Sequence, residues 1–455
     1  MPKFKLAEIL EATGAALRQE GKQTFSDVVT DTRRISDGVL FVALSGERFN
    51  GEDFAAEAVE KGAAGVLVAK SCPAGKLPKQ GAVLMVEDTL RAYQQIARAW
   101  RMKFDLPVVA VTGSNGKTTT KDLTAAVLSA RGPVCKTQGN FNNEIGLPLT
   151  LLGLQEEHTA AVVEIGMRGL HQIEALAPLA APSIGIVTNV GETHMELLGS
   201  IENIAQAKGE LVEAIPAGGA VVLNLDDPHV AAMRGKAKEG VRVITYGIEQ
   251  DADVRGEGIR RDGDVTRFMI CWQNERHDYV LPMLGRHNIY NALAAIATGF
   301  AMGMTSAEVM KGLRGLEATK MRFERVAHPK YEIINDAYNA SPMSMKAAIE
   351  TLSGMAKGRK VAVLGDMLEL GDISEKAHRE VGREVAEHDF SALVTYGELG
   401  KMIASGAKEA GLSNVHTADS HEQAAEFLKD ILQEGDTVLF KGSRGMQMEK
   451  IIEMI

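Results

Sequence analysis

The chain has 455 residues, of which 45% are hydrophobic and 24% are charged, and its 60 Asp and Glu residues outnumber 50 Lys and Arg residues to give a net charge of -10. This composition excludes a disordered or fibrous protein, and the length suits about two to four folded domains. The acidic balance predicts no nucleic acid partner and no attraction to an anionic membrane surface, so an anionic substrate would need a local basic pocket.

The first part of the chain has the pattern of a small α/β domain. Its predicted elements are strands over 38–44, 64–69 and 82–86 and a helix over 53–61. A helix predicted over 89–103 then leads through Pro107 into an apolar strand at 108–111. The change of pattern there predicts a boundary, and we assign residues 1–98 to the first domain.

The middle part alternates apolar strands with helical segments. The predicted strands are 160–165, 184–188, 220–225 and 241–246, and the clearest helix is 201–215. This alternation is typical of a parallel sheet with crossover helices. Residues 251–284 have instead the pattern of antiparallel strands that extend one edge of that sheet. We assign 99–314 to a central domain.

The last part follows a helical stretch over 291–313 and again alternates strands and helices. Its predicted strands are 332–335, 360–364, 392–396 and 437–440. We assign 315–455 to a Rossmann-like domain. The predicted fold class is therefore α/β with three domains: a small N-terminal α/β domain, a central domain with a parallel sheet and a C-terminal Rossmann-like domain.

Cysteine usage and hydropathy point to the cytoplasm. Cys72, Cys135 and Cys271 are an odd number at wide spacings, which predicts reduced thiols rather than disulfides or a zinc site. Residues 1–10 alternate charged and apolar side chains, unlike a signal peptide. No apolar run approaches the roughly 20 residues of a membrane-spanning helix. We therefore expect a cytoplasmic protein that does not insert into a membrane.

The phosphate loop, Thr112 to Thr120, carries the clearest chemical signal. It is a glycine-rich turn between an apolar strand and a helix start, so its N–H groups and the positive helix end can surround a phosphate. The predicted nucleotide-binding residues are Thr112, Gly113, Ser114, Asn115, Gly116, Lys117, Thr118 and Thr119. Lys117 would neutralise the β- and γ-phosphates of ATP, and the Thr118 hydroxyl would hold Mg²⁺. The central domain 99–314 is therefore predicted to be an ATP-binding domain with a P-loop ATPase-type parallel sheet. Val111 stands where the full pattern has glycine, and a chance turn before a helix is the alternative.

Two further segments follow strands at the same predicted sheet edge. Glu164 ends the strand 160–165 and is a candidate Mg²⁺ ligand, with a solvent-facing acid as the alternative. The loop 188–199 gathers Asn189, Glu192, His194 and Glu196. His194 is the best candidate for a second metal site, although a lone histidine in a polar loop is often merely exposed.

Lysine and amide side chains supply the remaining candidates. On spacing alone Lys208, in a predicted helix, is a surface lysine. Asn140, Asn142 and Asn143 lie in the amide-rich run 137–148, and such groups bind sugar hydroxyls and peptide groups well. An asparagine-rich turn that caps the next helix is equally compatible with that run.

These stretches together resemble the Mur ligase family over nearly the whole chain. The resemblance rests on 112–120, 139–148, 164–166, 188–199, 285–291, 321–324, 335–342, 365–371 and 441–444. It implies a first domain that binds the UDP end of a substrate, a central ATPase and a C-terminal lid. It also implies ATP and Mg²⁺ as cofactors, with Glu164 and His194 as metal ligands and Lys208 carbamylated, so that its new carboxylate reaches toward Mg²⁺.

The resemblance further implies contacts to nucleotide and substrate. Asn288 and Asn291 would lie near the adenine, while Arg322 and Asp336 would reach the nucleotide from the lid, Asp336 toward the ribose. The implied substrate-binding residues are Asp31, Arg33, Ser45, Asn50, Asn140, Asn142, Asn143, Tyr338, Asn339 and Ser341. Lys117, Lys208, His194 and Glu164 would form the catalytic set.

Within the family, the run 335–342 favours a ligase that adds D-alanyl-D-alanine to UDP-N-acetylmuramoyl-tripeptide in cytoplasmic peptidoglycan precursor synthesis. Such an enzyme would form an acyl phosphate with ATP and would close its lid on the substrates. We expect a monomer. The alternatives are another Mur-type or folylpolyglutamate-type amide ligase, and a non-ligase P-loop ATPase, which would leave the amide-rich loop and the flanking domains unexplained.

Overall fold

The computed structural model describes residues 4–46, 49–273, 275–316 and 321–455. By its internal contacts the chain divides into two compact units. Unit 1 comprises Met1–Val108, Gly132–Ile165 and Ala175–Pro182, and unit 2 comprises Val109–Arg131, Gly166–Glu174 and Ser183–Ile455. Each unit is described by itself.

Unit 1 is built on a five-stranded sheet with the order β2-β9-β8-β5-β4. Its strands are β2 (Ala16–Gln19), β4 (Val28–Val29), β5 (Leu40–Val42), β8 (Gly65–Ala69) and β9 (Ala82–Val86). β2 pairs antiparallel with β9, and the other neighbours are parallel. The three strands predicted for this region are confirmed, because their apolar runs are buried on both faces and build a core of valine, alanine and phenylalanine side chains.

The other elements of unit 1 are short. They are β1 (Phe4–Lys5), β3 (Thr24–Phe25), β6 (Ser45–Gly46), β7 (Phe49–Asn50), β11 (Val134–Lys136), β12 (Ala160–Glu164), α1 (Leu6–Thr13), α2 (Ala55–Glu60), α3 (Thr89–Arg101) and α5 (Gly146–Leu152), with α6 (Gln172–Ala180) from Ala175 onward. β11 and β12 pair in parallel. The predicted helices over 53–61 and 89–103 correspond to α2 and α3, and Asp88 caps α3 by accepting a hydrogen bond from the Arg91 N–H.

Unit 2 contains the strand series β10-β13-β14-β15-β16-β17-β18. These strands are β10 (Val108–Thr112), β13 (Ile184–Val187), β14 (Ala220–Asn224), β15 (Arg242–Gly247), β16 (Val254–Asp262), β17 (Val265–Trp272) and β18 (Glu275–Leu281). The pairs from β10 to β16 are parallel, and β16, β17 and β18 pair antiparallel. The predicted antiparallel extension of a parallel sheet is therefore confirmed.

The helices of this part of unit 2 lie between these strands along the chain or follow the last of them. They are α4 (Lys117–Leu128), α7 (Met195–Leu198), α8 (Ile201–Ala214), α9 (Pro228–Ala232), α10 (Arg286–Ala301) and α11 (Ser306–Arg314). The single helical stretch predicted over 291–313 is wrong, because the chain turns between α10 and α11. Gly303 has a φ of 68°, and Thr305 and Glu308 form a capping box that starts α11.

The rest of unit 2 is a six-stranded sheet with the order β19-β20-β24-β21-β22-β23. The strands are β19 (Glu324–Val326), β20 (Glu332–Asn335), β21 (Lys360–Gly365), β22 (Ala392–Tyr396), β23 (Val415–Ala418) and β24 (Thr437–Lys441), and the helices are α12 (Pro342–Met355), α13 (Ser374–Glu387), α14 (Gly400–Glu409), α15 (His421–Ile431) and α16 (Glu449–Ile452). β19 and β23 were not predicted, because both are short edge strands whose exposed polar residues hide the strand pattern.

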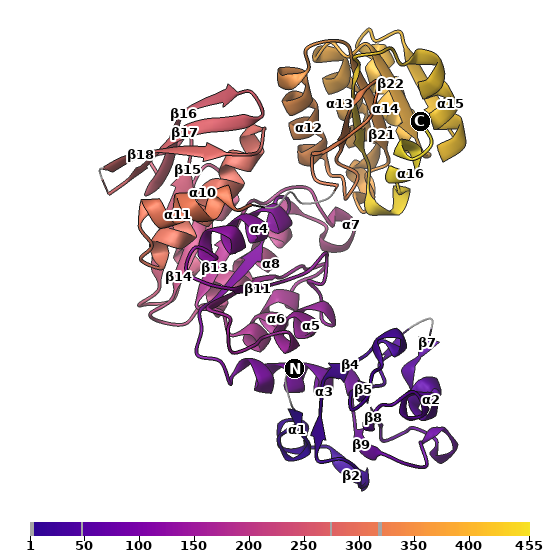
Figure 1. Ribbon diagram of the computed structural model, residues 1–455. Coiled ribbons are helices and arrows are strands. Elements are labelled where there is room, and N and C mark those ends of the chain that lie inside the picture. The colour runs from indigo at the N-terminus through magenta and orange to yellow at the C-terminus, as the bar shows by residue number, and fades with distance from the viewer. Residues whose placement is uncertain (1–3, 47–48, 274, 317–320) are drawn as a thin grey trace. The chain divides into compact units, whose positions relative to one another are not determined.

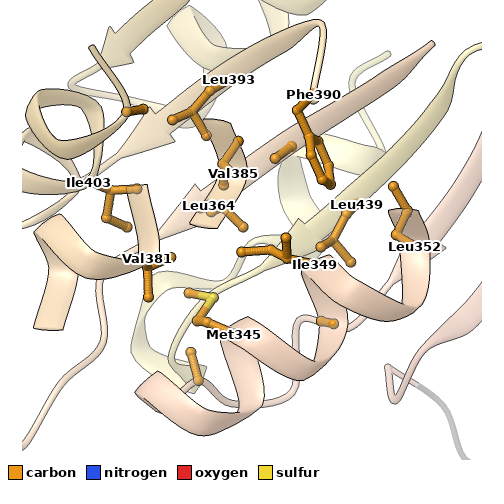
Figure 2. Packing of buried hydrophobic residues seen from close by; sticks show 14 of the residues in the cluster. Met345, Ile349, Leu352, Leu364, Val381, Val385, Phe390, Leu393, Ile403 and Leu439 are labelled. Atoms are coloured by element: carbon orange, nitrogen blue, oxygen red, sulfur yellow. The ribbon is translucent and has the colours of Figure 1, made fainter. Parts of the chain in front are cut away.

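Helices cover both faces of this sheet (Figure 1), and alternate residues of its strands belong to two separate cores. One face packs on α12, α13 and α14, and Figure 2 shows Ile349 of α12, Val385 of α13 and Ile403 of α14 in one cluster with Leu364 and Leu439 of the sheet. The other face packs on α15 and α16. Burial on both faces is what the near-continuous apolar strands 360–364 and 437–440 predict.

Across the described ranges, every helix is too short or too polar to cross a lipid bilayer.

Candidate active site

The phosphate loop runs from the end of β10 to the start of α4, as the sequence predicts. Gly113 and Gly116 have φ values of 146° and 78°, which side chains disfavour. A Cβ on Gly113 would collide with Thr188 Oγ1, and one on Gly116 would collide with Asn291 Oδ1. Both glycines are therefore required for the backbone curl that an anion cradle needs.

The segment after β13 braces the phosphate loop. The Asn115 N–H donates to Asn189 Oδ1 at 2.8 Å, and the Ser114 N–H donates to the Asn189 carbonyl at 2.9 Å. The Thr188 hydroxyl donates to the Asn115 carbonyl at 2.7 Å. These bonds fix the loop before any phosphate binds, which keeps reorganisation during a reaction small. The bracing role of Thr188 and Asn189 was missed in the sequence, where Asn189 was grouped with His194.

Two cationic side chains lie on the phosphate loop. Lys117 Nζ donates to the carbonyls of Gly113 and Ser114 at 2.9 and 3.1 Å. Arg322 donates to Thr118 Oγ1 at 2.8 Å, and its guanidinium lies 4.1 Å from the ring centroid of Tyr338. The arrangement places positive charge where the predicted phosphate groups carry negative charge.

Asn288 and Asn291, predicted to lie near the adenine, are buried on α10. The Thr120 hydroxyl donates to Asn291 Oδ1 at 3.1 Å, Asn291 donates to Asn288 Oδ1 at 3.2 Å, and Asn288 donates to the Leu284 carbonyl at 2.8 Å. This chain ties α10 to the helix that follows the phosphate loop. Contact with adenine stays a prediction.

His194 lies in the loop after β13, with a φ of 59°. Its Nδ1 lies 2.6 Å from Glu369 Oε2, and its side chain is 25% exposed, so the merely exposed histidine considered as an alternative is wrong. Burial lowers the pKa of His194, and the Lys117 and Lys208 ammonium groups lower it further, against the opposing effect of Glu369. The ring is therefore held neutral, the form that binds metals.

Lys208 on α8 is buried at 2% exposure, so the surface position predicted from spacing alone is wrong. Burial lowers its pKa well below the usual value, and the nearby Lys117 lowers it further. The signal was present in the sequence: Ile204, Ala207, Lys208 and Leu211 follow the spacing of one buried helix face. A lysine on that face cannot reach bulk water.

The predicted ribose ligand Asp336 follows β20. Its Oδ1 accepts from the Phe323 N–H at 3.1 Å, and its Oδ2 accepts from Lys441 Nζ at 2.5 Å. Lys441 is 3% exposed and also donates to the Asn339 carbonyl at 3.0 Å. Lys441 lies in a stretch that resembles the family, but the sequence assigned it no role.

Ser341 caps α12 and also touches the phosphate loop. Its hydroxyl lies 2.8 Å from Asn115 Oδ1, which it can reach as a donor, and accepts from the Ser344 N–H. Asn339 is exposed, and its Oδ1 accepts from the N–H of Ala340. Ser341 and Tyr338 are thus brought to the phosphate loop, whereas the side chain of Asn339 forms a hydrogen bond within its own turn.

Glu164 and the three predicted asparagines belong to unit 1. Glu164 is 2% exposed and accepts from Asn142 Nδ2 at 2.8 Å, so a solvent-facing acid is excluded. Asn143 Oδ1 accepts from the Gly146 N–H at the start of α5, the capping role that the sequence left open. Asn140 is exposed. Convergence of Glu164 with the phosphate loop stays a prediction.

The proposed UDP contacts also lie in unit 1. Asp31 and Arg33 form an ion pair at 2.6 Å, and this partner lowers the pKa of Asp31 to about 2. The Ser45 hydroxyl lies 2.9 Å from Asn50 Oδ1, which accepts from the Glu52 N–H. Residues 47 and 48 of that segment lie outside the described residues. These side chains are exposed or half-buried and point to no ligand by themselves.

The donor set suits Mg²⁺ more than a metal held by protein alone. Within the described ranges, no three His, Cys, Asp or Glu side chains gather closely enough to hold a metal ion. Mg²⁺ keeps several waters and takes one or two carboxylates together with substrate phosphates. Thr118 beside the phosphate loop and the half-buried His194 fit such a shared site.

The sequence matches three family descriptions in chain order: "Mur ligase family, catalytic domain" over residues 24–101, "Mur ligase middle domain" over 111–299 and "Mur ligase, glutamate ligase domain" over 321–444. The chain is 41% identical to the UDP-N-acetylmuramoyl-tripeptide--D-alanyl-D-alanine ligase of Bacillus subtilis (strain 168), over 98% of this chain and 96% of that enzyme.

Two solved structures are similar along nearly the whole chain. MurF from Acinetobacter baumannii (crystal structure I) has a TM-score of 0.91 and 30% identity, covering 100% of this chain and 98% of that one. The MurF ligase from Thermotoga maritima in complex with ADP has a TM-score of 0.83 and 27% identity, covering 94% and 96%.

Proposed function

Because the chain belongs to the Mur ligase family, we propose that it is an ATP-dependent amide ligase that joins D-alanyl-D-alanine to UDP-N-acetylmuramoyl-tripeptide through an acyl phosphate. The observation that carries the proposal is the braced phosphate loop with Lys117 at its helix start, in a chain that matches a ligase of that name over 98% of its length. The similar structure with bound ADP supports the use of ATP.

We place the domain boundaries at 98/99 and 314/315. The matched ranges 111–299 and 321–444 fall inside the second and third domains, and the range 24–101 ends close to the first boundary, which supports this division. The first domain would bind the UDP end of the substrate, with Asp31, Arg33, Ser45 and Asn50 as contacts. The second would bind ATP, and the third would act as the lid.

The first step makes the carboxylate reactive. A carboxylate oxygen of the tripeptide attacks the γ-phosphorus of ATP, the bond to the bridging oxygen breaks, and ADP leaves. The N–H groups of the phosphate loop and the Lys117 ammonium offset the charge that shifts onto the β-phosphate. The loop geometry supports this role because its donors are already aligned by Asn189 and Thr188.

The second step forms the amide. The free amine of D-alanyl-D-alanine attacks the acyl carbon, a proton leaves the nitrogen, and the phosphate departs with one oxygen of the original carboxylate. Water would hydrolyse the acyl phosphate, so the site must exclude it. Arg322 and Ser341 support a lid role because both reach the phosphate loop from the C-terminal sheet domain.

Mg²⁺ bound by Thr118, Glu164 and His194 would supply charge compensation between the two anionic reactants. Lys208 would complete this set after carbamylation. A lysine with a lowered pKa holds a neutral amine, which can attack CO2 to form an N–C bond and release one proton. The carbamate replaces a buried amine with an anion near the Lys117 ammonium, which favours it.

The substrate-facing residues would be the asparagines 140, 142 and 143 together with Tyr338, Asn339 and Ser341. For the asparagines the support is partial, since Asn143 caps α5 and Asn142 binds Glu164. We further propose that the enzyme acts as a monomer in the cytoplasm, where its precursor substrates are made.

The test is phosphate release from ATP with UDP-N-acetylmuramoyl-tripeptide, with and without D-alanyl-D-alanine. Release that requires both partners, with a product mass equal to their sum less water, is the expected outcome. Release that requires the tripeptide but accepts a single amino acid in place of the dipeptide would favour another Mur-type ligase. Release that needs neither substrate would favour a simple ATPase.

A further inference from the structure

His194 and Glu369 join two loops that lie far apart in the sequence. His194 follows β13, and Glu369 follows β21 of the six-stranded sheet, with 2.6 Å between Nδ1 and Oε2. A carboxylate oxygen can only accept a hydrogen bond, so the proton lies on Nδ1. The lone pair of the neutral ring is then on Nε2, the opposite side of the imidazole.

Both partners adopt an uncommon backbone conformation. The φ values of His194 and Glu369 are 59° and 63°, in the left-handed region that is unfavourable for a residue other than glycine. The loops also meet through the backbone, since the Glu196 N–H lies 3.5 Å from the Glu369 carbonyl. Two strained residues that face each other point to a function that requires their geometry.

Hydrogen bonds with buried side chains hold the segment that carries Glu369. We call Asp366 to Gly371 the lid loop. The Met367 N–H donates to His378 Nε2 at 2.9 Å, and the Leu368 N–H donates to Ser443 Oγ at 2.9 Å. Asp366 Oδ1 accepts from the Gly400 N–H at 2.6 Å. Because His378, Ser443 and Asp366 are buried, the lid loop presents Glu369 on a rigid support.

A second charged neighbour of Glu369 is Arg168. Arg168 lies 3.9 Å from its Oε1, with a side chain that is 72% exposed. An exposed pair at that distance contributes little. The shorter, half-buried bond to His194 is therefore the interaction that defines the position of the carboxylate.

We propose that Glu369 is a positioning residue that fixes the tautomer and ring orientation of His194, so that Nε2 is presented to Mg²⁺ only when the lid loop is in place. The inference rests on the proposed function, which makes His194 a metal ligand. Carboxylate partners of this kind orient metal-bound histidines, and their loss weakens metal affinity about 10- to 100-fold. The position of the lid loop thereby affects how tightly the site binds Mg²⁺.

The experiment uses the full-length protein with a non-hydrolysable ATP analogue and Mn²⁺ in place of Mg²⁺, with free Mn²⁺ measured by electron paramagnetic resonance. Glu369→Ala should raise the Kd for Mn²⁺ about 10- to 100-fold. Glu369→Gln should bind Mn²⁺ within about threefold of wild type, because its amide oxygen still accepts the hydrogen bond from His194 Nδ1. Asp372→Ala, an exposed carboxylate beside the lid loop, removes the same charge and should change nothing.

Either of two results would overturn the inference: a Glu369→Ala protein that binds Mn²⁺ within about twofold of wild type, or a Glu369→Gln protein no better than Glu369→Ala. Glu369→Met, which keeps the volume without an acceptor, carries the same expectation if the alanine variant does not fold. His194→Ala separates the two proposals. Unchanged Mn²⁺ affinity there would remove His194 as a ligand, and weakened affinity with a normal Glu369→Ala would remove only the role of Glu369.

Discussion

The phosphate loop and the lid loop are both short turns that follow a buried parallel strand, yet they keep their shape by different means. The phosphate loop depends on two glycines with positive φ and on hydrogen bonds to Thr188 and Asn189 after β13. The lid loop depends on two buried side chains, His378 and Ser443, that bind its backbone, and on its own Asp366, which accepts from the Gly400 N–H. Both loops are braced by residues more than 70 positions away, but only the phosphate loop also has a local pattern of glycines in the sequence.

The largest effect is expected when the positive charge of Lys117 is removed from the phosphate loop. Lys117→Ala should lower kcat/KM about 10³-fold, because one preorganised charged donor at a transition state is typically worth 10²- to 10³-fold or more. Lys311→Ala on the exposed side of α11 is the matched control. Steady-state phosphate release measures both. A Lys117→Ala enzyme with more than about a tenth of wild-type activity would show that the loop is not the phosphoryl donor site.

The next largest effect is expected when a side chain is added to a glycine of the phosphate loop. Gly116→Ala should raise the KM for ATP at least about tenfold, because the new Cβ meets Asn291 Oδ1 and the φ of 78° costs an alanine roughly 1 to 2 kcal/mol. Gly235→Ala, where the added Cβ has open space, should behave as wild type. An unchanged KM for Gly116→Ala would mean that the loop tolerates a side chain.

A smaller effect is expected on the unfolding free energy when the pH is lowered, because a neutral His378 binds the backbone of the lid loop. Burial lowers the pKa of His378, against opposing effects of Ser374 and Asp366, so the residue stays neutral with Nε2 accepting from Met367. An unfolded histidine titrates near pH 6.5, so the stabilising contribution is complete above about pH 6.5 and is lost as the pH falls below it. Between pH 7.5 and 5.5 the wild type should lose more unfolding free energy than His378→Gln, in which the acceptor does not titrate.

Urea unfolding at both pH values gives that difference. Equal losses in the two proteins would mean that His378 does not hold the lid loop in its neutral form.

The smallest effect concerns the hydrogen bond from the lid domain to the phosphate loop. Ser341→Ala removes both the α12 cap and the bond to Asn115, whereas Ser344→Ala removes the reciprocal capping bond and leaves Asn115 paired. Both should lose about 1 kcal/mol of stability, but only Ser341→Ala should raise the KM for ATP, by about two- to fivefold. Equal KM values would limit the Ser341 contact to helix capping.

The same contrast explains how much the sequence could predict. The phosphate loop was placed residue by residue because glycine, lysine and threonine follow an apolar strand at fixed spacing. The strands of the parallel sheets were predicted from their apolar runs, whereas their order in each sheet was not. Glu369 and Lys441 were quoted within motifs but given no role, because their partners His194 and Asp336 lie 175 and 105 positions away, and no local pattern records such a pairing.

The burial and hydrogen bonding of individual side chains were the second feature that the sequence did not predict. Lys208 was predicted to be a surface residue on spacing alone, although its position beside Ile204, Ala207 and Leu211 on α8 fits the buried face. Asn143 could not be assigned between substrate contact and helix cap, because both uses need the same amide in a turn; the structure shows the cap. The edge strands β19 and β23 were missed since half-exposed strands have weak apolar alternation.

The central claim is that ATP activates a carboxylate. It can be tested most directly with UDP-N-acetylmuramoyl-tripeptide labelled with ¹⁸O in its terminal carboxylate, incubated with ATP, D-alanyl-D-alanine and the enzyme. An acyl phosphate requires one labelled oxygen to pass from the carboxylate to each phosphate released, which mass spectrometry of the phosphate detects. Released phosphate that carries no ¹⁸O would contradict the assignment of the chain as an acyl-phosphate ligase.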